Sequence, residues 1–204
     1  MKGTFITFEG SEGCGKSTQS KLLCGYLKKN GYQVLFLREP GGTAISEKIR
    51  RILLDHKNDS MFSLTELLLY MASRAQVVHD VIIPALEKGV VVVCDRFLDS
   101  TIAYQGYGLG MDRRLIEYVG KTVTAGIKPD LTFFLDLPVE KGLLHRRHCS
   151  DRIEKRPLDY HRRVRMGYFA IARKEPKRLK VVRVEHDKMD TQNNIRAIVD
   201  TIVK

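Results

Sequence analysis

The sequence predicts an α/β fold built around a parallel β-sheet. Apolar runs of strand length alternate with stretches of helical periodicity along the chain. The run at residues 90–94 (VVVVC) is continuously apolar, which is typical of a strand buried on both faces. No repeat or linker divides the 204 residues. We therefore expect one domain, residues 1–204, whose ligands bind beyond the carboxyl ends of the strands.

In the first half of the chain, short β-branched or aromatic runs indicate strands, and apolar side chains at helical spacing indicate helices. A glycine-rich loop separates the first strand from the first helix, and Asn30-Gly31 ends that helix as a C-cap does. Pro84 should bend the end of the third helix. In order, we expect a strand at residues 3–9, a helix at 16–29, a strand at 33–38, helices at 46–54 and 64–87, and a strand at 90–94.

The second half continues the alternation with the apolar runs LTFFL and KVVRV. Helical patterns fill the intervals between and after these runs. In order, we expect a helix at about 112–124, a strand at 131–135, helices at 139–147 and 158–174, a strand at 180–184 and a helix at 191–203. Right-handed crossovers would place five parallel strands in one sheet between two helical layers.

The charge of the chain is concentrated near its C-terminus. Lys plus Arg number 35 and Asp plus Glu 24, a net charge of +11, and residues 141–183 alone hold 15 basic and 4 acidic residues. This segment is either a solvated helical face or a surface that meets phosphate groups. No RNA-binding, zinc-finger or helix-turn-helix motif accompanies it, so we expect no nucleic-acid partner. No apolar run approaches the ~20 residues that span a bilayer, and no signal peptide is recognisable. We expect a cytoplasmic protein without a membrane partner, its four cysteines unpaired.

Residues 10–17 (GSEGCGKS) fit the phosphate-binding motif GxxxxGK[ST] between a predicted strand and a predicted helix. Glycines let the backbone wrap closely around phosphates, and the helix N-terminus points partial positive charge at them. Lys16 should reach the β- and γ-phosphates of a nucleoside triphosphate, and the Ser17 hydroxyl is placed to bind Mg²⁺. The expected ATP-binding residues are Gly10, Ser11, Glu12, Gly13, Cys14, Gly15, Lys16, Ser17 and Thr18.

Motifs that distinguish the known classes of P-loop protein narrow the range of possible functions. The DxxG and NKxD motifs of GTPases and the LSGGQ motif of ABC-type ATPases are absent. Instead, Asp95 and Arg96 follow the third predicted strand, at the edge where ligands bind. The carboxylate suits Mg²⁺ or its water shell, whereas the arginine suits a second phosphate. The pair indicates that a phosphate donor meets a phosphate acceptor.

Residues 95–105 (DRFLDSTIAYQ) resemble the thymidylate kinase signature DR[FYH]xxSxxAYQ. Segments similar to that family occur in its order along nearly the whole chain: FEG at 8–10, REPGGT at 38–43, LLD at 53–55, ASR at 72–74, KPDL at 128–131 and DRIE at 151–154. The resemblance implies a P-loop NTPase fold with a short mobile lid. It also implies Mg²⁺-dependent phosphorylation of dTMP to dTDP by ATP in the dTTP pathway, and a homodimer.

The same resemblance implies a set of dTMP-binding residues. They are Glu12, Glu39, Arg50, Tyr70, Arg74, Arg96, Thr101, Tyr104 and Gln105. Glu12 would approach the 3′-hydroxyl, and Arg50 and Arg96 would hold the acceptor phosphate. Tyr70, where the family usually has Phe, would stack on the thymine.

The remaining members of that set would surround the base and the sugar. Arg74 would hydrogen-bond a thymine carbonyl, and Thr101 would contact the other side of the base. Tyr104 and Gln105 would crowd the sugar, with Tyr104 placed against a 2′-hydroxyl. Glu39 would line the dTMP side.

The bacterial type of this family that lacks an arginine in the P-loop uses arginines of the lid. Here Gly13 stands at that loop position, and residues 146–156 resemble the lid. Arg152 is the first candidate for the catalytic arginine, with Arg146, Arg147 and Arg156 as alternatives. The expected catalytic residues are Lys16, Asp95, Arg96 and Arg152, and the expected metal ligands are Ser17 and Asp95.

Two other functions stay open from the sequence. The chain could phosphorylate a different nucleoside or nucleoside monophosphate, although the GxPGxGKGT loop of adenylate kinases is absent. A P-loop ATPase that binds nucleic acid through residues 141–183 is the alternative from another class. The apolar residues Leu67, Met71 and Val78 fit either a dimer interface or the core.

Overall fold

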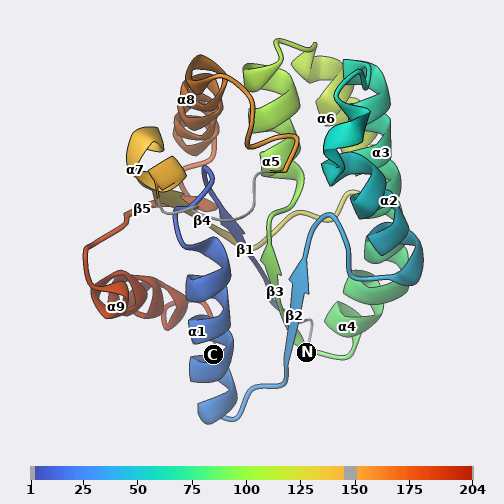
Figure 1. The fold of residues 1–204 in the computed structure, drawn as a ribbon. Coiled ribbons are helices and arrows are strands. Elements are labelled where there is room, and N and C mark those ends of the chain that lie inside the picture. The colour runs from blue at the N-terminus through green and yellow to red at the C-terminus, as the bar shows by residue number, and fades with distance from the viewer. Residues whose placement is uncertain (1–2, 145–150, 204) are drawn as a thin grey trace.

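A computed structural model describes residues 3–144 and 151–203 of the protein. Five parallel strands form one sheet in the order β2-β3-β1-β4-β5 (Figure 1). They are β1 (Phe5–Glu9), β2 (Val34–Arg38), β3 (Val91–Asp95), β4 (Leu131–Asp136) and β5 (Leu179–Arg183). The three central strands are almost wholly buried, because helices cover both of their faces. The parallel sheet predicted from the sequence is confirmed.

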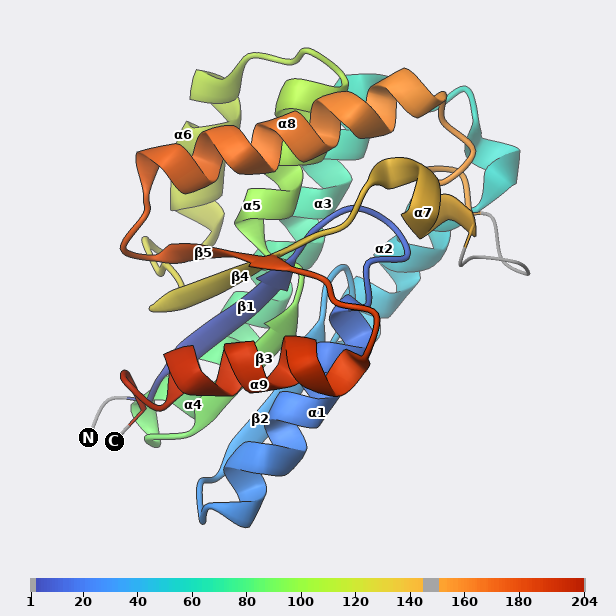
Figure 2. The same cartoon turned by 90° about the vertical axis from the view of Figure 1, so that its left-hand side faces the viewer.

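Helices form a layer on each face of the sheet, as Figure 2 shows. One layer consists of α1 (Lys16–Lys29) and α9 (Lys188–Val199), and Ile6, Phe8, Val93 and Phe133 pack toward it. The other faces of the strands, including Phe5, Val92 and Cys94, pack against the segment 77–86. Alternate residues of one strand thus serve two separate cores.

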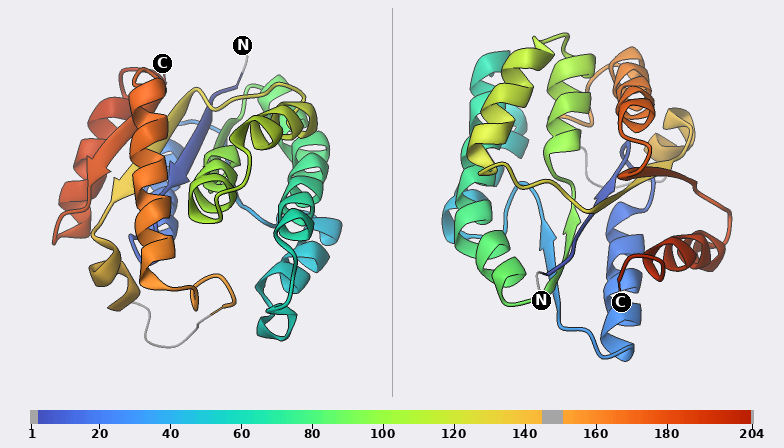
Figure 3. Two further views of the ribbon diagram at one scale, coloured as in Figure 1. Left: turned by 90° about the horizontal axis from the view of Figure 1, so that it is seen from above. Right: turned by 180° about the vertical axis from the view of Figure 1, so that it is seen from behind.

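The second layer contains the remaining helices. They are α2 (Ala44–Leu54), α3 (Ser63–Val77), α4 (Ile83–Glu87), α5 (Leu98–Thr101), α6 (Arg113–Val123), α7 (Val139–Leu144) and α8 (Leu158–Lys174), with π-helical turns η2 (Val78–Ile82) and η3 (Ile102–Gly108) and a 3-10 turn η1 (His56–Asn58). Seen from above in Figure 3, α5 lies between α8 and α3. No helix in the described ranges is long and apolar enough to cross a membrane.

Most differences from the predicted elements occur in this second layer. The expected helix at 64–87 is three elements, with a π-helical turn just before Pro84, whose missing N–H cannot continue the α-helical bonding. The α5–η3 segment was not predicted to be helical. Polar residues of the motif at residues 95–105 interrupt its apolar residues, so no helical periodicity is evident in the sequence. The last helix starts at Lys188 rather than 191, after the cap that the Asp187 side chain provides to Met189 N.

Leu67, Met71 and Val78 lie in the core rather than on an interface. Leu67 and Met71 pack with Ile116 of α6, and Val78 belongs to the core cluster on the sheet face that contains Phe5 and Val92. Cys14, Cys24 and Cys94 are unpaired and buried, whereas Cys149 lies outside the described residues.

Candidate functional site

A cavity of about 440 Å³ opens at the carboxyl edge of the sheet. Segments that are distant in sequence meet there: the P-loop, the end of β2, α3, the end of β3, the α5–η3 segment and the strip that follows residue 150. Of the residues predicted to bind nucleotides, the cavity is lined by Glu12, Gly13, Gly15, Lys16, Ser17, Thr18, Glu39, Arg50, Tyr70, Arg74, Asp95, Arg96, Thr101, Tyr104 and Gln105. Gly10, Ser11, Cys14 and Arg152 do not line it.

The P-loop joins β1 to α1 and depends on left-handed backbone at its glycines. Gly13 has φ +70°, and a Cβ at this position would lie 1.9 Å from the carbonyl oxygen of Gly142 in α7. Lys16 folds over the loop and donates to Gly10 O at 3.1 Å and Ser11 O at 2.8 Å. Cys14, within the loop, is only 1 % exposed and packs into the core cluster that contains Ile6 and Phe8. The loop is therefore shaped to present backbone N–H groups and one ammonium to an anion.

Ser17 and Asp95 come from different elements and meet at the cavity. The Ser17 hydroxyl, in the first turn of α1, donates a hydrogen bond to Asp95 Oδ2 at the end of β3. Both groups offer oxygen, the donor type that Mg²⁺ prefers. Among the described residues no group of three or more His, Cys, Asp or Glu could hold a metal. Mg²⁺ usually takes one or two protein oxygens and completes its shell with phosphates and water, a role that Ser17 and Asp95 suit.

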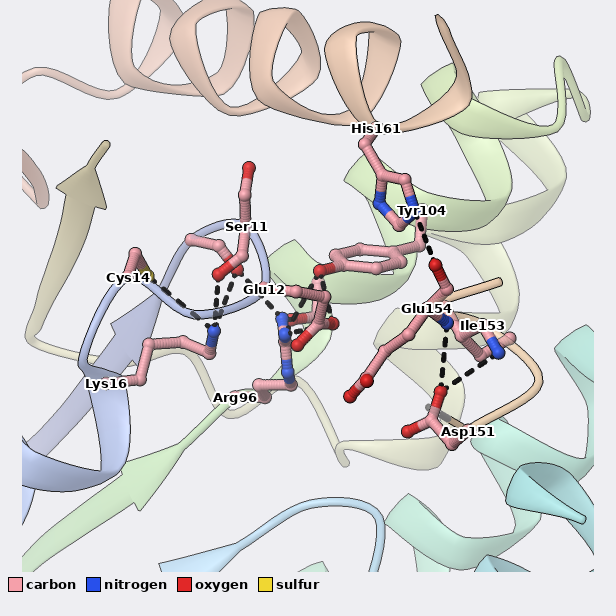
Figure 4. A network of polar contacts seen from close by, with 12 residues as sticks. Ser11, Glu12, Cys14, Lys16, Arg96, Tyr104, Asp151, Ile153, Glu154 and His161 are labelled. Atoms are coloured by element: carbon pink, nitrogen blue, oxygen red, sulfur yellow. Dashed lines mark hydrogen bonds and ion pairs between the residues drawn. The ribbon is translucent and has the colours of Figure 1, made fainter. Parts of the chain in front are cut away.

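Arg96 leaves β3 through a left-handed backbone conformation with φ +74°. Such a conformation costs about 1–3 kcal/mol for a residue other than glycine and is maintained only by strong surrounding contacts. The guanidinium donates to Glu12 Oε1 at 2.6 Å, Tyr104 OH at 3.0 Å and Gly10 O at 3.1 Å (Figure 4). Burial acts to lower the pKa of Arg96, but the Glu12 carboxylate and other neighbours raise it well above its ordinary value. Arg96 is thus a permanent cation beside the P-loop.

Glu12 and Tyr104 complete this cluster. Tyr104 OH donates to Glu12 Oε1 at 2.8 Å, and the Arg96 guanidinium lies 4.9 Å from the Tyr104 ring centroid. Burial raises the pKa of Tyr104 well above its ordinary value, so its hydroxyl keeps the proton. Figure 4 shows the three side chains pointing toward one another, with Lys16 on the P-loop side. Two cations from different elements, Lys16 at the start of α1 and Arg96 just after β3, therefore stand at one cavity.

Arg74 is the most heavily bonded side chain on the other side of the cavity. It is 2 % exposed and donates to Glu39 Oε2 at 2.7 Å, Thr101 Oγ1 at 2.9 Å and Phe97 O at 3.0 Å. Glu39 Oε1 is buried and has no hydrogen-bond partner among the described residues. A buried carboxylate oxygen without a donor is costly, so this edge of the cavity suits a ligand or water that donates.

Arg50 and the REPGGT segment form the rim near β2. The Glu39-Pro40 peptide bond is cis, and Arg50 Nη1 donates to Pro40 O at 3.0 Å. Burial, and then the nearby Arg38, lower the pKa of Arg50 from its ordinary value. A cation held close to a second cation favours an anionic ligand between them.

Arg152, the first candidate for the catalytic arginine, binds the protein itself in this structure. It is 5 % exposed, with Nε donating to Leu53 O at 3.1 Å and Nη2 to Glu66 Oε2 at 2.6 Å. The fully buried Glu66 carboxylate requires a cation, and Arg152 supplies it. Arg156 also binds Glu66, at 2.6 Å. The other candidates, Arg146 and Arg147, lie outside the described residues.

Sequence reasoning missed several residues of the site. Ser100 and Tyr168 both contact Arg96, at 3.1 and 3.4 Å, and both hydrogen-bond the buried Glu9. Burial, then the charge of Asp99, raise the pKa of Glu9 to about 7. Ser100 belongs to the quoted signature and could have been found there. Tyr168 carries no local signal, because it reaches the site from α8.

Comparisons with known proteins show which family the chain resembles. A family model described as thymidylate kinase matches residues 8–195. A thymidylate kinase of Thermoanaerobacter sp. (strain X514) is 44% identical over 200 residues, covering 98% of each chain. A thymidylate kinase of Trichlorobacter lovleyi is 50% identical over 186 residues, covering 87% of this chain and 88% of the other. The crystal structure of thymidylate kinase from Ehrlichia chaffeensis superposes with a TM-score of 0.80 at 36% identity, covering 98% and 99% of the two chains. Because the family model matches most of the chain and these relatives are 44–50% identical to it, the chain belongs to the thymidylate kinase family.

Proposed function

We propose that the protein transfers the γ-phosphoryl group of ATP to dTMP and forms dTDP. The observation that carries this proposal is the placement of Lys16 and Arg96 at one cavity beside a slot formed by Tyr70, Arg74 and Thr101. Lys16 belongs to the loop that suits a triphosphate, and Arg96 and Arg50 suit the phosphate of the acceptor. The slot suits a flat base.

Catalysis in this arrangement is alignment and charge neutralisation. The phosphate of dTMP is itself a nucleophile, so no strong general base is needed. Lys16 and Arg96 would hold the two phosphate groups in line and neutralise charge on the transferring oxygens. Ser17 and Asp95 would hold Mg²⁺, which when bound neutralises charge on the phosphates of ATP.

The buried cluster around Arg96 suits a deoxyribose. We propose that Glu12 meets the 3′-hydroxyl and that the Tyr104 ring, fixed by Arg96 and Glu12, leaves no room for a 2′-hydroxyl. Tyr104 is only 6 % exposed and cannot turn away without breaking both contacts.

A turnover assay tests the proposal. Purified protein with ATP, Mg²⁺ and one nucleoside monophosphate at a time should release ADP rapidly with dTMP and slowly with dUMP. AMP and the ribose analogue of dTMP should give no product. ATP hydrolysis without acceptor preference would contradict the proposal and favour the nucleic-acid-stimulated ATPase, which predicts salt-sensitive binding of DNA or RNA.

We further propose that the protein is a homodimer in which α3 and α6 take part. The two helices pack together through Leu67 and Ile116, yet Leu68 and Tyr118 on them are 51 % and 75 % exposed. Large apolar side chains at such exposure on neighbouring helices are typical of an interface.

A further inference from the structure

Two polar contacts bridge α3 and the α5–η3 segment on either side of Tyr70. Arg74 Nη1 donates to Thr101 Oγ1 at 2.9 Å, and Gln105 Nε2 donates to Glu66 Oε1 at 2.8 Å. Glu66, Tyr70 and Arg74 are four residues apart and share one face of α3, as Thr101 and Gln105 do on the opposite segment. The slot for the base therefore has a polar contact at each end and an aromatic ring between them.

Glu66 has no part in the mechanism described above, yet it is fully buried. Its Oε2 accepts from Arg152 Nη2 and from Arg156 Nη2, both at 2.6 Å. Its Oε1 accepts from Gln105. A carboxylate between two guanidinium groups is an acceptor at both oxygens and donates to nothing.

This chemistry fixes the orientation of the Gln105 side-chain amide. Because Glu66 only accepts, the NH₂ group of Gln105 must face it, and the amide carbonyl must face the other way. Gln105 lines the cavity, and within residues 3–144 and 151–203 no donor to its carbonyl oxygen is found. The cavity wall thus contains an acceptor from Gln105 and, beside Thr101, the Arg74 guanidinium, which is itself anchored to Glu39, Thr101 and Phe97 O.

We propose that Glu66 is a positioning residue that makes the site select bases with an N–H at the pyrimidine N3 position. The inference rests on the proposed function. Thymine and uracil present a carbonyl next to N3–H, which complements the Arg74 donor and the Gln105 carbonyl. Cytosine presents an amino group next to an N3 acceptor, so both contacts would be mismatched.

The Glu66→Gln variant tests the proposal directly. A glutamine can donate as well as accept, so Gln105 can turn its amide and offer N–H to the base. A site built to hydrogen-bond its substrate commonly rejects a mismatched one by about 10⁴-fold. We expect the ratio of kcat/KM for dTMP over dCMP to fall at least about tenfold in this variant. The ratio for dTMP over dUMP should stay within about twofold, because the two bases share the edge in question.

Two control variants separate orientation from general stability. Glu66→Asp keeps a group that only accepts, so the preference for dTMP over dCMP should persist even if turnover falls. Arg156→Gln removes one cation from Glu66 and leaves the Gln105 contact in place, and it should also keep the preference. A loss of preference in either control equal to that of Glu66→Gln would overturn the proposal.

Removing the charge of Glu66 leaves Arg152 buried without its partner, which can prevent folding. The paired variant Glu66→Gln with Arg152→Met replaces both charges and is the second test, after circular dichroism has shown that it folds. Unchanged selection between dTMP and dCMP in a folded variant lacking the Glu66 carboxylate would overturn the inference. Absence of dTMP turnover in the unaltered protein would instead contradict the proposed function itself.

Discussion

Arg96 is the residue on which the proposed transfer depends most. Its guanidinium reaches Glu12, Tyr104 and Gly10 only because the backbone turns with φ +74° at the end of β3. The guanidinium of Arg96 is planar and has several donors in fixed directions, so it can bind a phosphate while it also binds a carboxylate. A lysine would supply only a point charge.

We expect Arg96→Lys to lower kcat/KM for dTMP by about 10²–10³-fold, the usual effect of removing one preorganised donor from a transition state. The variant should fold, because the charge opposite Glu12 is retained. Arg162→Lys is the matched control, since Arg162 is half exposed and pairs with Glu140 at the surface. Steady-state kinetics with both substrates measures the effect, and a loss below about threefold would contradict the role given to Arg96.

Glu9 should make stability depend on pH near neutrality. Burial raises its pKa from 4.5 to about 7, so its protonated form is favoured in the folded state. This contribution to stability is complete below pH 4.5 and is lost as the pH rises through 7, by on the order of 3 kcal/mol.

Glu9→Gln cannot ionise, so its free energy of unfolding should fall less than that of the unaltered protein between pH 5 and pH 8. Urea titrations at each pH measure this, with the exposed Glu87→Gln as control. If the free energy of unfolding changed with pH equally in the three proteins, Glu9 would be ionised in the folded state and the prediction would be wrong.

Among the elements, α7 and the P-loop fit each other through two glycines. A Cβ on Gly142 would lie 2.2 Å from Glu12 O, and one on Gly13 would lie 1.9 Å from Gly142 O. Backbone of the loop and backbone of the helix are in contact, so neither can accept a side chain without moving the other.

Gly142→Ala should therefore displace the P-loop and raise KM for ATP more than KM for dTMP, by about tenfold or more, an effect that a 1 Å shift can produce. Gly25→Ala is the control, because nothing lies within 4 Å of its Cβ position in α1. That variant should be more stable by up to about 1 kcal/mol and equally active. Equal KM values for Gly142→Ala and the unaltered protein would contradict the contact between loop and helix.

At the scale of the whole molecule, four arginines of the C-terminal basic segment form ion pairs within the protein. Arg165 pairs with Asp136 at 2.7 Å, Arg178 with Asp99 at 2.6 Å, and Arg152 and Arg156 with Glu66. These pairs join α8 to β4, the residue before β5 to α5, and the strip at residues 151–156 to α3. These basic residues therefore stabilise the structure around the cavity, in addition to any contact that the segment makes with phosphate.

The proposed dimer leads to a prediction at the same scale. Leu68→Glu places a charge on the exposed side of α3, so it should halve the mass measured by light scattering. Met166→Glu, at a position 54 % exposed on α8, should leave the mass unchanged. A monomer in the unaltered protein would contradict the dimer.

Features that depend on neighbours along the chain could be predicted from the amino-acid sequence alone. The P-loop, the helix behind it and the Asp95-Arg96 pair follow from local spacing, because glycines, strand ends and helix starts impose their geometry on adjacent residues. The central strands were equally clear, since continuous apolar runs have few alternatives to a buried sheet.

Which distant charges meet could be seen only once the fold was known. Arg152 appeared as a candidate for catalysis because its motif is local, yet its partner, Glu66, is 86 residues away and fully buried. Nothing near Glu66 in sequence indicates that it would bind Arg152, Arg156 and Gln105 together. A buried carboxylate must find cations and donors wherever the fold brings them, and that choice is made by packing rather than by spacing.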